Sequence, residues 1–187
     1  MLAEYASGFF TFHNKMYGTN VDVSALESYS FHKVLNLSKD EILHRMNLFH
    51  NTEEFKHLLP VVGAKDALNQ LSSHSKLIAI TARSQDIQQH TQDWLETHFQ
   101  KKIEKIHFAR NVHIGETKNK SKADFCREAG VNVMIEDSFE NACDCSSNGI
   151  LTFLIDKPWN QGTLPNKVIR VKSWNEIVKS IPITEHF

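Results

Sequence analysis

Short apolar runs alternate with segments of helical periodicity from Ala64 onward, and this alternation limits the possible folds more than any other feature of the sequence. It is typical of a parallel sheet wrapped by helices, because parallel strands are joined through helical crossovers. Five runs are expected to be strands: Leu77–Ile80, Lys105–Ala109, Val131–Ile135, Ile150–Ile155 and Lys167–Val171. Residues 64–187 are therefore predicted to form a three-layer, Rossmann-like α/β core.

Helical patterns fill the segments between these strands. The clearest runs from Gln85 to Phe99, with Ser84 placed to cap its first turn. Gly130 and Gly149 stand where helices should end and strands begin. Ser173, followed three residues later by a glutamate, predicts the start of a last helix.

The first 63 residues have a different character, with helical periodicity and no convincing strand. Glu4 to Tyr17 has apolar residues at helical spacing. Ser38 with Glu41 has the form of a capping box, and Asn51 with Glu54 suggests a further short helix. We therefore expect residues 1–63 to form a separate helical module.

Composition excludes several classes of protein. The 187 residues carry 21 Lys and Arg against 22 Asp and Glu, so no net field favours nucleic acid or an anionic membrane. No apolar run is long enough for a signal or membrane segment. Cys126, Cys143 and Cys145 show no disulfide-framework spacing and are expected to be structural. A reducing cytoplasm fits this cysteine usage best.

The strand predicted over Val131–Ile135 ends on two adjacent carboxylates, Glu136 and Asp137. Ligands of open α/β sheets gather beyond the carboxyl ends of the strands. Neighbouring carboxylates repel each other unless a cation or a proton separates them, which suits oxygen-liganded Mg²⁺. The alternative is a solvated turn in which Asp137 or Ser138 caps the next helix.

Two further groups are expected near this acidic strand end. The strand from Leu77 runs into Thr81-Ala82-Arg83, whose hydroxyl and backbone N–H groups suit a phosphate oxygen. Lys122 follows Ser121 at an expected helix start, where a cation opposes the helix dipole and calls for an anionic partner. The simpler alternatives are a threonine that merely ends a strand and a surface lysine.

These three segments together resemble motifs two, three and four of the haloacid dehalogenase superfamily. The segments are, in order, Ile80-Thr81-Ala82-Arg83, Ser121-Lys122-Ala123 and Ile135-Glu136-Asp137-Ser138. The N-terminal module is similar to the cap of the superfamily's 5′(3′)-deoxyribonucleotidase-like branch through Phe12-His13-Asn14-Lys15 and Tyr17-Gly18-Thr19-Asn20. Asp156-Lys157-Pro158-Trp159-Asn160 also resembles that branch.

The resemblance implies a role for each residue. Thr81 would contact the transferred phosphoryl group, with Ala82 and Arg83 beside it, and Lys122 would neutralise its charge. Lys120 is a weaker candidate for this lysine. Glu136 and Asp137 would hold Mg²⁺. The implied substrate is a small phosphate monoester, such as a nucleotide.

The departure from the family is as informative as the match. The family's first motif, Asp-x-Asp-Gly, ends the first strand and supplies the nucleophile and the acid/base, yet no Asp-x-Asp occurs in this sequence. Leu2-Ala3-Glu4-Tyr5 resembles the segment that comes directly after this motif in relatives, so we expect the chain to begin one strand late. The missing strand is central in relatives, so the strands from Leu77 and Val131 should stay apart or re-pair.

Two functions remain possible from the sequence. One is an Mg²⁺-dependent phosphohydrolase of nucleotidase type, inactive as written because its nucleophile motif is absent. The other is a catalytically silent relative that keeps a phosphate site as a binding or interaction module. An in-frame strand ending Asp-x-Asp-Gly upstream of Met1 would favour the enzyme. The sequence specifies neither the substrate nor the oligomeric state, and an oligomer is possible.

Overall fold

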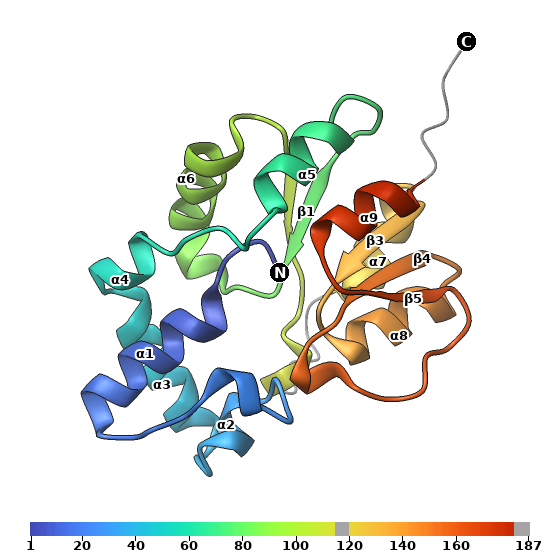
Figure 1. Cartoon of the computed structure of the whole chain (residues 1–187). Helices are drawn as coiled ribbons and strands as arrows, with labels where there is room; N and C mark the ends of the chain where they lie inside the picture. The colour runs from blue at the N-terminus through green and yellow to red at the C-terminus, as the bar shows by residue number, and fades with distance from the viewer. Residues whose placement is uncertain (115–119, 182–187) are drawn as a thin grey trace.

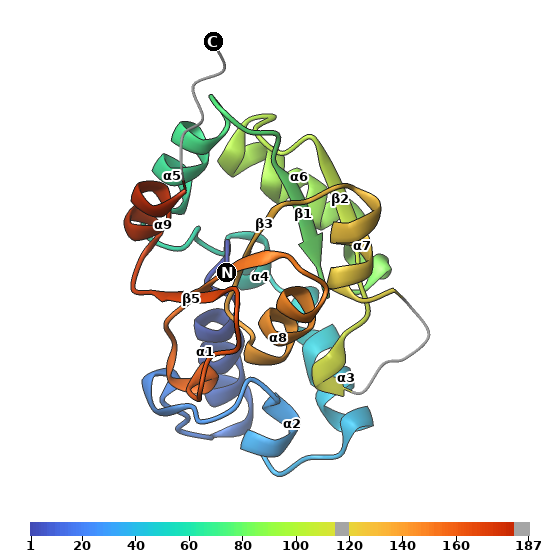
Figure 2. The ribbon, with the colours of Figure 1, turned by 90° about the vertical axis from the view of Figure 1, so that its right-hand side faces the viewer.

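The computed structural model describes residues 1–114 and 120–181 and consists of an α/β core joined to a layer of helices. The end of the predicted core, 182–187, lies outside these described residues. The core has three layers, because one set of helices packs on each face of its parallel strands (Figures 1 and 2). This is the predicted α/β architecture.

The N-terminal helices surround a core of aromatic residues. They are α1 (Tyr5–Tyr17), η1 (Val23–Ala25), α2 (Phe31–Val34), α3 (Lys39–His50) and α4 (Glu53–Lys56). Phe9, Phe10 and Phe49 are fully buried between them. We call these helices the cap. The predicted boundary after residue 63 stays a prediction, although α5 begins at Ala64.

Three of the cap's details test the sequence predictions. The helix predicted to reach Tyr17 does end there, with Gly18 in the left-handed conformation, and the Ser38 side chain caps α3. The start predicted at Asn51 is wrong by one residue, because Thr52 caps α4 by accepting from the N–H of Phe55. The short helix α2 had no counterpart among the predicted elements.

The core elements follow in the expected alternation. They are α5 (Ala64–Leu71), β1 (Ile78–Thr81), η2 (Gln85–Ile87), α6 (Gln88–Phe99), β2 (Lys105–Phe108), η3 (Val112–Ile114), α7 (Lys122–Glu128), β3 (Val133–Glu136), α8 (Phe139–Ser147), β4 (Leu151–Ile155), η4 (Pro158–Asn160), β5 (Val168–Val171) and α9 (Trp174–Ser180). The five predicted strands are confirmed, and each end lies within two residues of its predicted place.

The strands form two parallel sheets instead of one. One has the order β1-β2 and the other the order β3-β4-β5. Among the described residues, β1 and β3 do not pair, although Ile80 and Met134 belong to one apolar cluster with α7 and α8. The opposite face carries α5, α6 and α9. The strands from Leu77 and Val131 thus stay apart, one of the two arrangements expected.

The chain crosses between cap and core at two segments that pair with each other. Ala3 and Pro60 form an antiparallel bridge, and the N–H of Val61 donates to the carbonyl oxygen of Leu2 at 2.7 Å. The N–H of Glu4 donates to Leu59 at 3.0 Å. The paired segments place the start of α1 near the carboxyl ends of β1 and β3 (Figure 1).

Candidate functional site

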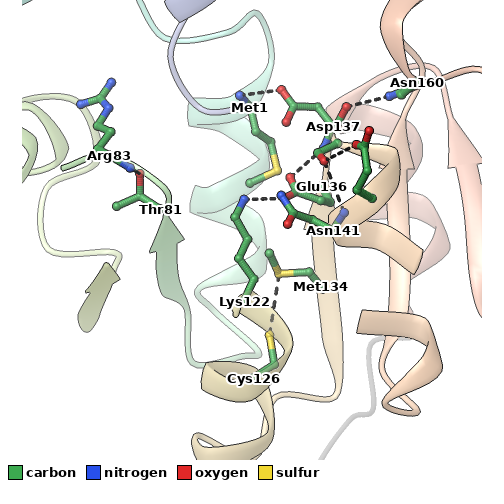
Figure 3. Close-up of polar contacts among 12 residues, drawn as sticks. Met1, Thr81, Arg83, Lys122, Cys126, Met134, Glu136, Asp137, Asn141 and Asn160 are labelled. Carbon is green, nitrogen blue, oxygen red and sulfur yellow. Dashed lines mark hydrogen bonds and ion pairs between the residues drawn. The ribbon is translucent and has the colours of Figure 1, made fainter. Parts of the chain in front are cut away.

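Lys122 and Glu136 form an ion pair at the carboxyl end of β3 (Figure 3). Lys122 opens α7, where the Ser121 side chain accepts from the N–H of Asp124 in a capping box. The Lys122 side chain is 11% exposed and that of Glu136 is 0% exposed. The anionic partner that the dipole argument required for Lys122 is therefore Glu136.

Both carboxylate oxygens of Glu136 accept hydrogen bonds from within the protein. Besides Lys122, Oε1 accepts from the side-chain amide of Asn141 at 2.9 Å, and Oε2 accepts from the N–H of Asp137 at 2.8 Å. Burial would lower the pKa of Lys122, but the Glu136 carboxylate outweighs it and raises that pKa. The pair is therefore a fixed, charged element of the site.

Asp137 lies beside this pair and is the more accessible carboxylate. Its side chain is 13% exposed, and Oδ2 lies 3.0 Å from the α-ammonium of Met1. Burial would raise the pKa of Asp137, but the Met1 ammonium and Lys122 outweigh it and lower that pKa. Asp137 is therefore an anion at neutral pH.

The backbone of Asp137 is anchored from the loop after β4. Its carbonyl oxygen accepts from the Trp159 indole N–H and from the Asn160 amide, each at 3.0 Å. The Asn160 amide also donates to Ile155 at 2.7 Å. Trp159 therefore packs beside the acidic strand end, and Asn160 holds the loop against β4.

A small cavity of about 30 Å³ lies between cap and core at this point. Its walls include Tyr29 of the cap together with Met1, Asp137, Lys157 and Trp159. The ring of Tyr29 lies 5.2 Å from Trp159 and 5.1 Å from His113. Pockets for small ligands usually measure about 300–1,000 Å³. The cavity is therefore too small for such a ligand in this arrangement of cap and core, and neither Thr81 nor Lys122 lines it.

Thr81 ends β1 of the other sheet and Arg83 follows in the turn, and both lie apart from the Lys122–Glu136 pair (Figure 3). The backbone N–H of Arg83 donates to Thr81 Oγ1 at 3.2 Å, which shapes the turn after β1. The Arg83 side chain points away from Lys122, Glu136 and Asp137. The structure thus brings Lys122, Glu136 and Asp137 into contact, whereas Thr81, Ala82 and Arg83 form a separate part of the same strand-end edge.

The remaining candidates occupy structural positions. Lys120 is half-exposed and pairs with Glu128 at 2.7 Å. Cys126 and Cys145 are buried between α7 and α8, and Cys143 is partly buried. Asn141 was missed in the sequence, although its place three residues after the cap residue Ser138 puts it near the strand end.

The donors present suit a hydrated metal ion better than one enclosed by protein. Among residues 1–114 and 120–181, no group of three or more His, Cys, Asp or Glu side chains is placed to hold a metal ion. Mg²⁺ often uses one or two carboxylates, keeps several waters and takes its other oxygens from a phosphate. Asp137 fits such a role, whereas Glu136 already accepts three hydrogen bonds.

Comparison with known proteins identifies the family. The model of the family described as 5′ nucleotidase, deoxy (pyrimidine), cytosolic type C protein matches residues 1–186. The chain belongs to this family. The resemblance to the nucleotidase-like branch of the haloacid dehalogenase superfamily is thereby confirmed.

Similarity to individual proteins supports the assignment of this chain to the nucleotidase family. YqfW of Bacillus subtilis is 26% identical over 179 residues, which cover 95% of this chain and 88% of YqfW. A nucleotidase of Clostridium acetobutylicum is 26% identical over 169 residues, covering 88% and 80% of the two chains. A haloacid dehalogenase-like hydrolase from Streptococcus pneumoniae shares the fold, with a TM-score of 0.65 and 17% identity over 95% and 92% of the chains.

Within the part of the chain that the structure describes, no helix is long and apolar enough to cross a membrane.

Proposed function

We propose that this chain is a nucleotidase-type relative that binds a small phosphate monoester, such as a nucleotide, between cap and core and does not hydrolyse it as written. The observation that carries the proposal is the Lys122–Glu136 pair, fixed beside Asp137 at the carboxyl end of β3 in a member of a nucleotidase family. The cysteine usage supports a reducing, cytoplasmic location.

Each residue has a distinct role in this proposal. The hydroxyl of Thr81 and the backbone N–H groups of Ala82 and Arg83 contact phosphate oxygens. Lys122 faces the same phosphate and supplies positive charge. Glu136 holds the Lys122 ammonium in place, since a buried lysine without a counter-ion tends to lose its proton.

Mg²⁺ is the metal that this proposal implies. Asp137 would hold it, with the bound phosphate and water as further ligands, and Glu136 would contribute through the charge that it shares with Lys122. When bound, the ion would neutralise phosphate charge. Asp137 is suited to this because its backbone is fixed by Trp159 and Asn160.

The lack of turnover is explained by the residues that are absent from the sequence. Hydrolysis through an aspartyl-phosphate needs a carboxylate in line with the leaving oxygen and a second group that protonates that oxygen. No Asp-x-Asp is present in this sequence, and Thr81, Lys122, Glu136 and Asp137 offer only positioning and charge stabilisation.

The test compares two proteins, this chain and a version extended by an apolar strand ending Asp-x-Asp-Gly. Both are assayed with Mg²⁺ on nucleoside monophosphates and on a chromogenic phosphate. We expect turnover from the extended version alone, and loss of that turnover in its K122M variant. Equal turnover by both proteins that depends on Lys122 and Asp137 would refute the proposal, because it would require another nucleophile.

The second candidate function is a catalytically silent phosphate-binding or interaction module. The saturated hydrogen bonding of Glu136 favours it, because a strand end already neutralised by Lys122 is stable without a metal. An extended version that binds phosphate without turning over any of these substrates would support this candidate over a nucleotidase.

A further inference from the structure

Arg83 extends from the proposed phosphate-binding turn into the junction between cap and core. Its guanidinium carbon lies 5.3 Å from the ring centre of Phe55, 5.8 Å from that of Tyr5 and 5.9 Å from that of Trp94. Cations within about 6 Å of aromatic ring centres are attracted to the ring faces. Phe55 and Tyr5 belong to the cap, whereas Trp94 belongs to α6 of the core.

The polar contacts of the Arg83 side chain are few for a group in this environment. Its guanidinium donates to Thr91 Oγ1 at 3.3 Å, and no carboxylate among the described residues lies within ion-pair distance of it. A guanidinium has five N–H donors, and an uncompensated charge is costly to remove from water. The rings of Phe55 and Tyr5 in the cap, together with that of Trp94 in the core, are therefore the main attraction that holds the Arg83 side chain in this place.

The same junction contains the two paired segments that link cap and core. Trp94 of the core donates its indole N–H to the carbonyl oxygen of Leu58 at 2.7 Å, next to the linker bridge between Pro60 and Ala3. Tyr5 hydrogen-bonds His50 at 2.8 Å and so ties α1 to α3. Movement of the cap about the paired linkers would move the rings around Arg83.

The backbone of Arg83 lies in the turn after β1, which is the proposed phosphate-binding segment. Its N–H donates to Thr81 Oγ1, so the conformation of the turn after β1 and the position of the guanidinium are set by one residue. An anion that takes hydrogen bonds from this turn would compete for the same N–H and hydroxyl. A change at the turn would therefore reach the cap through a single side chain.

We propose that Arg83 is a positioning residue that couples occupation of the phosphate-binding turn to the docking of the cap. The inference rests on the proposed phosphate site and adds to it a connection between that site and the cap. The cavity between Tyr29 of the cap and Asp137 measures only about 30 Å³, and in this proposal the cap moves to admit the ligand and Arg83 makes that movement respond to phosphate.

Hydrogen exchange of the whole chain, measured by mass spectrometry with and without saturating inorganic phosphate, tests this proposal. In the wild type, phosphate should slow exchange in β3 and α7 and also in α1 and α4. The R83M variant should exchange its α1 and α4 amides about tenfold faster without phosphate, as expected from the loss of a desolvated cation–π group. Its α1 and α4 should no longer respond to phosphate, whereas β3 and α7 should.

Two further variants complete the design. R83K keeps the charge but not the planar fork, and we expect a reduced response of the cap with an intact fold. It provides the answer if R83M does not fold. R127M is the matched control, because Arg127 lies on α7 with 61% of its side chain exposed and pairs with Asp124. Its cap should respond to phosphate as in the wild type.

The outcomes separate the inference from the function it rests on. A phosphate response of α1 and α4 that persists in R83M and R83K would overturn the coupling while leaving the phosphate site intact. Failure of phosphate to protect β3 and α7 in the wild type would refute the phosphate site itself, and the coupling with it.

Discussion

The Lys122–Glu136 pair is almost fully removed from water, so its two charges are costly to separate. The K122M variant leaves the Glu136 carboxylate buried without its counter-ion, and we expect the free energy of unfolding to fall by about 3–5 kcal/mol. Denaturant titration at pH 7 measures this. The double variant K122M/E136Q should regain part of the loss, and a double variant as unstable as K122M would contradict the pairing.

The same pair predicts a pH dependence. Because Glu136 raises the pKa of Lys122 above its ordinary value of 10.5, the folded chain holds that proton more tightly than the unfolded chain. Its contribution to stability is complete below 10.5 and is lost as the pH rises through the raised pKa. The difference in the free energy of unfolding between wild type and K122M should therefore narrow as the pH rises through the raised pKa of Lys122. A constant difference would mean that packing, not charge, explains the first result.

Asp137 offers one accessible carboxylate, so Mg²⁺ alone should bind weakly, in the millimolar range. Phosphate should strengthen Mg²⁺ binding by supplying further oxygens, and D137N should remove this effect. Calorimetric titration of Mg²⁺ with and without phosphate measures both. D144N on α8 serves as the control and should behave as the wild type. Micromolar Mg²⁺ binding without phosphate would show that ligands other than Asp137 are present.

At the scale of helices and strands, the sequence predicted elements whose ends depend on local contacts. Ser173 caps α9 as expected, because its side-chain oxygen reaches an N–H three residues on. Ser84 caps only the short helix η2, and the helix predicted from Gln85 begins as α6 three residues later, at Gln88. The helix α2 was missed, and the side chain of Ser30, which precedes it, makes no capping hydrogen bond. Packing holds it instead, with the Phe31 ring 4.7 Å from Phe10 and 5.3 Å from Phe9.

Close packing of α1 gives a prediction for Gly8. A Cβ atom at this position would clash with the Leu58 side chain and lie 3.3 Å from Phe49. Alanine favours a helix by about 1 kcal/mol over glycine, but overpacking of a core costs about 1–3 kcal/mol. Leu58 is 6% exposed and has little room to move, so we expect G8A to be destabilised by about 1 kcal/mol in thermal unfolding.

The double variant G8A/L58A identifies the cause. L58A alone leaves a cavity, which the new methyl group at position 8 partly fills, so the double variant should be more stable than the sum of the two single effects. Additive effects would show that Gly8 and Leu58 do not limit each other, and a stabilised G8A would show that the helix propensity wins.

At the scale of the whole molecule, the sequence predicted a contact between distant residues only where a charged group needed a partner of opposite charge. The need for an anion near Lys122 was readable from the helix dipole, and Glu136 meets it across fourteen residues. The direction of the Arg83 side chain could not be read from the sequence, because it depends on aromatic rings that the cap brings to the junction. Likewise, Tyr29 reaches Trp159 only through docking of the cap.

Because its strands form two separate sheets, we expect the chain to self-associate. β1 and β3 each have one paired neighbour among the described residues, and three of the four side chains of β1 are partly exposed, in contrast to one of five in β4. Unpaired strand edges are templates for pairing with another chain. We expect the sedimentation coefficient of this chain to rise with protein concentration.

V133K at the edge of β3 should suppress that rise, since a charge on an edge opposes pairing. I169K on β5 is the matched control and should not, with near-ultraviolet circular dichroism confirming that both variants fold. A concentration-independent monomer with a sharp, reversible thermal transition would contradict the prediction, and suppression by I169K alone would assign the association to β5.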